Sequence, residues 1–329
     1  MRASLLPRPN LILRRLLWTQ ARVPHPRLLA AVWLLALGVP VWPVAASPAP
    51  ASASGPASPP VPAPALPTVV STDLCSDLLL LSVAAPEQIL SVSRQSQNPR
   101  VSPIAETARA YLPNRGGVED LLYLKPDVAL VYSGWTARRH ADLLAERRTR
   151  LIALPYPRTW QDTLASVRTI SAQIGRAAAG ELRIAEAERR MRALAKRHRP
   201  YRVLYLRPNG GTAGSGTYVD DVLSRIGLRN LAAEQGISGW GRFPLERLVI
   251  EPPDLFLLGY FDDGQSPARS AYGRHALFQS LLTDTPSVRV PSEYWGCGGL
   301  ELVRAAEEIA YRIDRAMHPR AGMSQPQRH

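Results

Sequence analysis

The sequence predicts an α/β fold of two lobes, each built on a parallel β-sheet and joined to the other by one long α-helix. Three observations lead to this prediction. Apolar runs of strand length alternate with amphipathic segments of helix length along most of the chain. One helix–strand pattern occurs twice at a spacing above 100 residues, which suits two related lobes better than a solenoid. Between the two copies, residues 177–199 show no strand pattern.

The repeated pattern is "VEDLLYLKPDVALVY" from Val118 and "LERLVIEPPDLFLLGY" from Leu245. In register, Glu119 aligns with Glu246. Each copy is typical of a short amphipathic helix, a Pro-Asp stop and a buried strand, because the residue before a proline is disfavoured in a helix.

The first lobe is predicted at residues 68–175. Its opening strand "TVVSTD" leads into a helix capped by Thr72 or Asp73, and the strand "EQILSVS" follows. After the first copy of the repeat we expect a helix at 137–146, the strand "RLIALP" and a helix that begins near Trp160. This alternation predicts a Rossmann-like lobe, with helices on both faces of a parallel sheet.

A connecting helix is predicted at residues 176–199, where apolar residues such as Leu182, Ile184 and Met191 recur at helical spacing. About 20 residues at ~1.5 Å rise give a rod of roughly 30 Å. The second lobe, residues 200–317, opens with the strand "YRVLYLRP" and the helix "YVDDVLSRIG". It closes with the strand "SVRVP" and the helix "GLELVRAAEEIAYRI".

The ends of the chain differ in composition from the lobes. Residues 1–46 have the layout of a signal peptide, with six arginines before an apolar run and Val44 and Ala46 at the small-residue positions of a cleavage site. We expect cleavage after Ala46 and a periplasmic protein, with an uncleaved membrane tether as the alternative. Residues 47–67 read as a Pro/Ala/Ser-rich linker and residues 318–329 as a disordered tail.

The charge distribution argues against nucleic-acid binding. The formal net charge is +13, but residues 1–67 and 318–329 hold eight arginines and no acid. The span from Thr68 to Met317 therefore keeps 32 basic and 27 acidic residues, which places the predicted lobes near +5. A surface of that balance lacks the concentrated positive field that nucleic acid attracts.

Several motifs in order carry a resemblance to a known family: "VVSTDLCSDLLL", "LKPDVALVY", "NGGTAGSGTYVDDVLSRIGLRNLA", "PPDLFLL" and "VPSEYWGCGGLE". Over residues 68–313 the chain resembles the substrate-binding proteins of ABC importers for cobalamin and ferric siderophores, whose lobes are held by a single long helix. The resemblance implies a monomer that captures a metal chelate between its lobes and delivers it to a permease dimer in the inner membrane. It implies no permanently bound cofactor. We rank cobalamin or a related corrinoid first, a ferric siderophore second and haem third.

Candidate ligand-binding residues lie where strands lead into helices, because ligands of open α/β sheets collect at the carboxyl ends of the strands. These junctions are rich in aromatic residues, and large rings on exposed loops reduce solubility unless they face a partner. The alternative is that the rings pack the loops against the lobes. The candidates are Trp135, Tyr156, Trp160, Tyr218, Trp240 and Trp295, with Arg242 and the neighbouring Arg138, Arg139 and Arg207 as partners for anionic groups.

The loop from Asn209 to Thr217 holds four glycines. Such a loop can present backbone N–H groups to an anion, and it can equally be a flexible turn.

Cys75 and Cys297 are the two cysteines of the chain. Cys75 follows the first predicted strand of one lobe and Cys297 the last strand of the other, so both are expected at the cleft and are included among the ligand-binding candidates. Three states are open: a disulfide that ties the lobes together, unreactive thiols, or thiolate ligation of a metal centre.

Permease docking is predicted from the family resemblance. In that family an acidic residue on each lobe contacts arginine on one permease half, and the matching residues here are Glu119 and Glu246. A two-fold partner calls for two equivalently placed acids. The alternative is a pair of surface acids that the helix dipole favours near helix N-termini.

No catalytic residues and no metal ligands are predicted, and we expect no enzyme activity. The sequence contains no "HExxH", no "CxxC" and no serine in a nucleophile elbow. Two other function classes remain as alternatives: an enzyme with a buried metallocluster in a similar two-lobed fold, and a tethered sensor not coupled to transport.

Overall fold

The computed structural model describes residues 65–197, 199–261 and 271–317. The predicted signal peptide, the predicted tail and most of the predicted linker lie outside these residues. By its contacts the chain divides after Val61, and every described residue belongs to the unit that begins at Pro62. Within the described ranges, none of the helices combines the length and hydropathy needed to span a bilayer.

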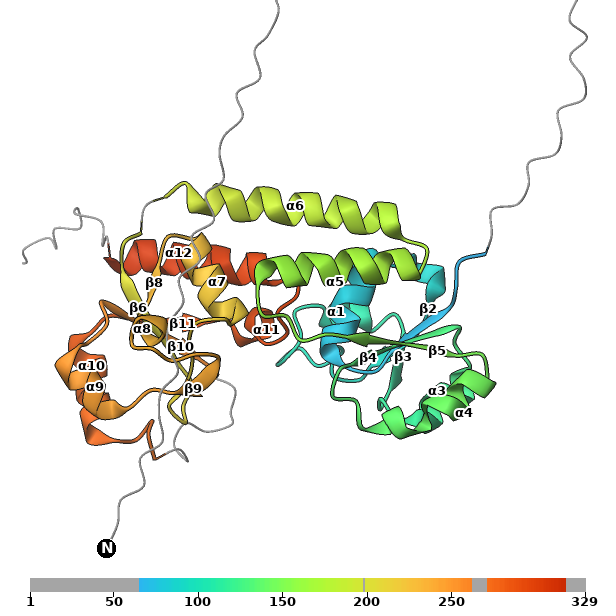
Figure 1. The fold of residues 1–329 in the computed structure, drawn as a ribbon, viewed down its shortest axis with the longest axis horizontal. Coiled ribbons are helices and arrows are strands. Elements are labelled where there is room, and N and C mark those ends of the chain that lie inside the picture. Colours follow the sequence, from blue (N-terminus) through green and yellow to red (C-terminus); the bar gives the residue numbers. More distant parts are fainter. Residues whose placement is uncertain (1–64, 198, 262–270, 318–329) are drawn as a thin grey trace, which may run out of the picture. The chain divides into compact units, whose positions relative to one another are not determined.

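The first sheet is a parallel sheet in the order β3-β2-β1-β4-β5 (Figure 1). Its strands are β1 (Val69–Ser71), β2 (Ile89–Ser93), β3 (Leu112–Asn114), β4 (Val128–Tyr132) and β5 (Arg150–Leu154). Strand β4, between β1 and β5, is buried on both sides. Val128 and Leu130 belong to one apolar cluster, and Ala129 and Val131 to another on the opposite face. This is the pattern of a parallel strand covered by helices on both faces.

The helices of this lobe are α1 (Leu74–Val83), α2 (Ala105–Ala108), α3 (Val118–Leu124), α4 (Ala141–Glu146) and α5 (Trp160–Gln173), with 3-10 turns η1 (Pro86–Gln88) and η2 (Thr136–His140). The predicted helices of this lobe occur in the predicted order, and α2 was not predicted from the sequence. Asp73 caps α1 by accepting hydrogen bonds from the N–H groups of Cys75 and Ser76. The helix predicted at 137–146 is in fact η2 followed by α4, so its first half has the tighter 3-10 winding.

The second sheet is also parallel, in the order β11-β10-β6-β8. Its strands are β6 (Arg202–Leu206), β8 (Arg229–Asn230), β10 (Leu255–Gly259) and β11 (Ser287–Val290). Its helices are α7 (Tyr218–Arg225), α8 (Leu231–Glu234), α9 (Leu245–Ile250), α10 (Ala276–Asp284), α11 (Ser292–Trp295) and α12 (Leu302–Met317). A separate antiparallel pair, β7 (Gly211–Ala213) and β9 (Trp240–Arg242), was not predicted from the sequence. The α/β fold with two parallel sheets is confirmed.

The internal repeat has a structural reason in its Pro-Asp step. In the first copy the carboxylate of Asp127 accepts hydrogen bonds from the backbone N–H and the hydroxyl of Thr68, at 2.8 and 2.7 Å. In the second copy the carboxylate of Asp254 accepts from the N–H of Arg202 at 2.7 Å. Thr68 and Arg202 stand at the start of β1 and β6, the first strand of each sheet. Asp127 therefore holds the start of β1 beside β4, and Asp254 holds the start of β6 beside β10.

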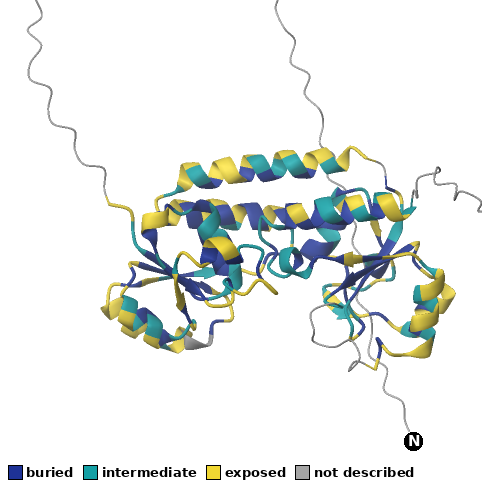
Figure 2. Ribbon diagram, turned by 180° about the vertical axis from the view of Figure 1, so that it is seen from behind, coloured by how far each residue is buried: buried dark blue, intermediate teal, exposed yellow. Residues whose placement is uncertain are grey.

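The predicted connecting helix is α6 (Ala177–Ala195). Figure 2 shows it buried along the side that faces α5 and α12 and exposed on the other side. The buried side carries Gly180, Ile184, Ala187 and Met191 at helical spacing. At its far end, Arg190 forms a bidentate ion pair with Glu307 of α12, at 2.8 and 2.6 Å. The exact lobe boundaries stay a prediction.

One apolar cluster runs through both sheets. It joins the faces of the two sheets that α5, α6, α7 and α12 cover. Members from successive elements are Val69, Leu130, Trp160, Val167, Ile184, Met191, Val203, Val222, Leu257 and Ile309. Since the cluster is continuous, the lobes share a core on the α6 side, and the opposite face of each sheet has its own smaller cluster.

Helices α5 and α6 approach closely at Gly180. A Cβ built there would lie 2.7 Å from the Cβ of Ser171. We predict that Gly180→Ala lowers the free energy of unfolding by about 1–3 kcal/mol, the usual cost of overpacking. In a Ser171→Gly background the same substitution should be neutral or stabilising, because alanine favours a helix over glycine by about 1 kcal/mol. Urea unfolding of the four proteins measures this. Equal losses in both backgrounds would rule out the contact.

A buried carboxylate ties α1 to the first two strands. Asp77 is fully buried and accepts hydrogen bonds from the hydroxyls of Ser71 and Ser93 and from the N–H of Ser93. Burial raises the pKa of Asp77 from 3.8 to about 7, although these hydrogen bonds oppose the shift. The unfolded chain thus releases this proton near pH 4, whereas the folded protein holds it until about pH 7.

The contribution of Asp77 to stability is therefore full below about pH 4 and is lost as the pH rises to about 7. We predict that Asp77→Asn gains stability relative to the wild type over this range, by up to about 4 kcal/mol at 1.36 kcal/mol per pKa unit. Urea unfolding at pH 4, 5.5 and 7.5 measures the difference, with the exposed Asp284→Asn as the control. A difference that does not change with pH would mean that Asp77 is already ionised in the folded protein.

Candidate ligand-binding site

The two cysteines form a disulfide between the lobes. Cys75 lies in the first turn of α1, and Cys297 follows α11; their Cα atoms are 5.2 Å apart. Of the three states left open by the sequence, the structure shows the cross-link, so neither sulfur is a thiol or a thiolate metal ligand. The bond spans 222 positions, for which the chain-entropy model gives a stabilisation of about 5 kcal/mol.

A pocket opens on one side of the disulfide, at the carboxyl ends of β1, β4 and β5. Its volume is about 390 Å³. Its lining residues are Asp73, Leu74, Cys75, Gln95, Tyr132, Ser133, Leu154, Pro155, Tyr156, Gly296 and Cys297. Residues of both lobes thus line it, at the sheet edge where ligands of open α/β folds bind. Tyr132 and Tyr156 expose 43% and 52% of their surface.

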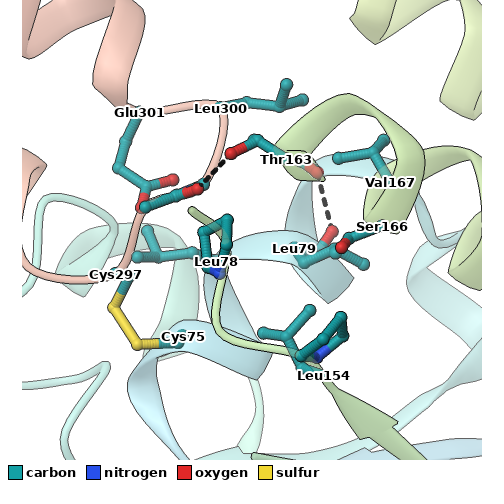
Figure 3. A pocket seen from close by; sticks show the side chains of 15 residues that line it. Cys75, Leu78, Leu79, Leu154, Thr163, Ser166, Val167, Cys297, Leu300 and Glu301 are labelled. Atoms are coloured by element: carbon teal, nitrogen blue, oxygen red, sulfur yellow. Dashed lines mark hydrogen bonds between the residues drawn. A yellow bond between two sulfur atoms is a disulfide. The ribbon is translucent and has the colours of Figure 1, made fainter. Parts of the chain in front are cut away.

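A smaller cavity lies on the other side of the disulfide, shown in Figure 3. It holds only about 40 Å³ of free space, enough for water but not for a chelate. Glu301 borders it and accepts a hydrogen bond from the N–H of Gly299 at 3.0 Å. Burial raises the pKa of this carboxyl to about 7, against the opposing effect of backbone N–H groups. This cavity is therefore part of the supporting structure and not a candidate site.

The second lobe contributes a pocket of about 330 Å³ built around Arg207. The guanidinium carbon lies 4.6 Å from the ring centre of Trp240 and 4.9 Å from that of Tyr260, and Nε donates to the hydroxyl of Tyr205 at 3.1 Å. Burial acts to lower the pKa of Arg207, but Tyr205 and the other phenols raise it, and the net direction is upward. Among the described residues no carboxylate pairs with this cation. Arg207 is therefore positioned to bind an anionic group of a ligand.

A row of three aromatic rings connects the two pockets. The ring of Tyr218 lies 5.7 Å from that of Tyr156 and 5.8 Å from that of Trp240, both in edge-to-face contact. The hydroxyls of Tyr156 and Tyr218 are 3.4 Å apart. Since Tyr156 follows β5 of the first lobe and Trp240 begins β9 of the second, the row crosses from one lobe to the other.

Polar contacts fasten the lobes beneath this row. The N–H of Trp160 donates to the carboxylate of Asp221 in α7 at 2.8 Å. The hydroxyl of Thr163 donates to the carbonyl oxygen of Gly298 at 2.6 Å, a bond drawn in Figure 3. The hydroxyl of Tyr218 donates to the carbonyl of Trp295 at 2.8 Å. The first two contacts join α5 of the first lobe to elements of the second.

Three of the four predicted indole rings are buried, which corrects the expectation that they stand on exposed loops. Trp160 exposes 1% of its surface because, as the first residue of α5, it points into the shared core. Trp295 exposes 0% and packs against Tyr205 and Tyr218. Trp135 exposes 7% of its surface, and its indole N–H donates a hydrogen bond to the carbonyl oxygen of Gly116 at 2.8 Å. For these three the packing interpretation is the correct one.

The remaining candidates are more accessible. Trp240 exposes 38% of its surface, and Arg242 is exposed beside it in the same pocket. Tyr218 is fully buried but forms the centre of the aromatic row. Direct ligand contact by Tyr156, Trp240 and Arg242 stays a prediction. Arg138 and Arg139 lie in η2 and line none of the pockets described above.

The glycine-rich loop is held by hydrogen bonds within the chain. The N–H of Gly210 donates to the carbonyl of Arg207, that of Gly211 to the side-chain oxygen of Asn209, and that of Gly214 to the carbonyl of Gly239. Residues 211–213 form β7 against β9, and Thr217 caps α7 by accepting from the N–H of Asp220. The glycines at 210 and 216 have φ near +80° and +75°, which favours glycine. The loop therefore serves to place Arg207 and Trp240 side by side.

The two predicted docking acids occupy matching positions. Glu119 is the second residue of α3 and Glu246 the second residue of α9. Both are exposed, and among the described residues neither forms an ion pair. Their role in docking stays a prediction.

Comparison with known proteins agrees with this architecture. The chain matches the family model described as periplasmic binding protein over residues 69–266, more than half of its length. None of the curated proteins compared with the chain matches it.

Solved structures resemble the chain in fold. A periplasmic haem-binding protein, RhuT from Roseiflexus sp. RS-1, is 20% identical with a TM-score of 0.61, covering 77% of this chain and 99% of its own. The haem-binding HutB of Vibrio cholerae is 20% identical with a TM-score of 0.62, covering 75% and 98%. The vitamin B12-binding BtuF of Vibrio cholerae is 15% identical with a TM-score of 0.55, covering 76% and 97%. Together with the family match, the two-lobed fold shows that the chain belongs to the periplasmic binding protein family of ABC importers.

Proposed function

We propose that this chain captures a metal chelate between its lobes and delivers it to the permease of an ABC importer. The observation that carries the proposal is the row Tyr156–Tyr218–Trp240, with Arg207 at one end as a cation that no carboxylate of the described residues pairs. The exposed rings at its two ends, Tyr156 and Trp240, suit a flat or apolar ligand, and a guanidinium suits its carboxylate or phosphate groups. The pocket volumes, about 390 and 330 Å³, are within the usual range for small-molecule sites.

The chelate would already hold its metal ion before it enters the site. Among the described residues no group of three His, Cys, Asp or Glu side chains could bind a metal ion. The two cysteines are bonded to each other and supply no thiolate. A chelate that brings its own ligands meets this condition, so the metal is cargo.

Cobalamin or a related corrinoid is our first candidate, ahead of a ferric siderophore. A corrinoid carries its own equatorial ligands, a large face for the aromatic row and a phosphate for Arg207. Haem is the second candidate function, because the exposed phenols of Tyr132 and Tyr156 line the pocket and a tyrosine oxygen can ligate ferric haem. The solved structures that resemble this chain include proteins named for haem and for vitamin B12, which fits both candidates.

We further propose that the protein works as a monomer in the periplasm. The predicted signal peptide supports export. The disulfide supports an oxidising compartment, since such bonds rarely persist in the cytosol. Glu119 and Glu246 would then face the permease, one on each lobe.

Ligand titration tests the ligand class. Purified protein is titrated with cobalamin, a ferric siderophore and haemin, and tryptophan fluorescence is followed. We expect one chelate to quench with saturation, and Trp240 to account for most of the change because it is the most exposed tryptophan of the described residues. Absorption spectra of the complex distinguish a tyrosine-ligated ferric haem from a corrinoid whose spectrum is little changed. No quenching by any chelate would reject the proposed ligand class.

Two substitutions test the site itself. Trp240→Ala removes a face of the aromatic row, and Arg207→Ala removes the cation. Each should raise the Kd for the bound chelate roughly tenfold, the effect of losing about 1–2 kcal/mol of stacking or charge-assisted contact. Tyr311→Ala is the control, because Tyr311 is a 55% exposed aromatic on α12 and lines none of the pockets. If Trp240→Ala binds like the control, the aromatic row is not the ligand surface.

A further inference from the structure

The two most exposed large apolar side chains of the described residues occupy the same position in the internal repeat. Tyr123 exposes 83% of its surface and Ile250 exposes 79%. Under the alignment of Glu119 with Glu246, Tyr123 falls on Ile250. Single exposed apolar residues are common on protein surfaces and need no explanation. Two exposed apolar residues at the same repeat position, both more exposed than any other large apolar residue described, do need an explanation.

Each of these side chains shares a helix face with a docking acid. Glu119 and Tyr123 are four residues apart in α3, and Glu246 and Ile250 are four residues apart in α9. Residues at this spacing are neighbours on a helix surface. All four are exposed, and neither acid has an ionic partner among the described residues. Each of these helices therefore presents a carboxylate that has no ionic partner in the described ranges next to an exposed apolar side chain.

The opposite side of each helix explains its orientation. Leu121 of α3 and Leu248 of α9 are fully buried, in the separate clusters on the faces of the two sheets away from α6. These leucines also match in the repeat. Because a leucine at the same repeat position anchors each helix to its sheet, the acid and the apolar residue face outward in the same way on both lobes.

We propose that Tyr123 and Ile250 are the apolar halves of two docking points, each completed by Glu119 or Glu246, for a two-fold symmetric permease. The fitting partner surface presents, at two equivalent places, a cationic side chain beside an apolar recess. Charge attraction guides such an encounter, whereas burial of an exposed ring or branched side chain slows dissociation. A surface repeated within one chain matches a partner with two-fold symmetry. The inference rests on the proposed transport function.

The experiment measures docking apart from ligand capture. Wild-type protein and the variants Tyr123→Ser, Ile250→Ser and the double variant are bound to the permease–ATPase complex of the same organism in lipid nanodiscs, and the Kd and dissociation rate are recorded. Leu182→Ser is the matched control, since Leu182 is a 72% exposed apolar residue on α6 without a repeat partner. Glu119→Ala and Glu246→Ala form a second arm. Chelate affinity and thermal stability are measured for every variant.

We expect each serine variant to weaken docking roughly tenfold, mainly through faster dissociation, and the double variant to weaken it further. Leu182→Ser should dock like the wild type, and chelate affinity should not change in any variant. Weaker docking of the alanine variants with unchanged docking of the serine variants would overturn this inference and leave the acid contacts standing. If all four positions are neutral, the docking face is elsewhere. If the wild type does not bind the complex, the transport proposal fails with it.

Discussion

The continuous apolar core on the α6 side is the constraint on which the rest of the structure depends. It contains side chains from both sheets and from α5, α6 and α12, so separating the lobes would expose them to water. At about 25 cal/mol per Å² of apolar surface, such exposure is costly. Movements that open this core are therefore unfavourable. A ligand bound as proposed would meet the pockets at the carboxyl ends largely in the form described above.

The disulfide and polar contacts add to this restraint. The Cys75–Cys297 bond and the Thr163–Gly298 hydrogen bond join the two lobes directly. Leu79 and Val167 line the small cavity beside the disulfide and also belong to or pack against the shared core, so the cross-link borders that core. At the proposed site such restraint would favour affinity through preorganisation, since little conformational freedom would be lost when a ligand enters.

The sequence predicts the architecture well because its signals are local. Strands β4 and β10 are apolar runs after a Pro-Asp step, and α6 is a long segment with helical periodicity; each is visible in a short window. The small elements were missed because they give no such local signal. Strands β7 and β9 have three residues each, one of them a glycine in each strand, so they are too short for a periodicity to reveal them. Their pairing depends on residues almost 30 positions apart.

The site was predicted less well, because position in a loop does not fix the direction of a side chain. Trp160 is the first residue of α5 and Trp240 the first residue of β9. The first turns into the shared core, and the second remains at the surface against Arg207. Only the packing of α5 on α6 and the pairing of β9 with β7 decide the difference. In the sequence, Arg207 is one of several arginines near the loops. Its place in the candidate site depends on contacts with Trp240 and Tyr260, which lie far from it in the sequence.

The order of the two cysteines along the chain has a consequence for biosynthesis. Cys75 belongs to the first helix of the described residues, whereas Cys297 comes after the last strand. During synthesis the earlier thiol has no partner in its own chain until almost all of the second lobe has been made. Because the chain has no third cysteine, an incorrect internal pair is impossible, and the competing products are bonds to small thiols or to another molecule. The bond thus requires that synthesis has passed Cys297, and a chain terminated before that residue can never acquire it.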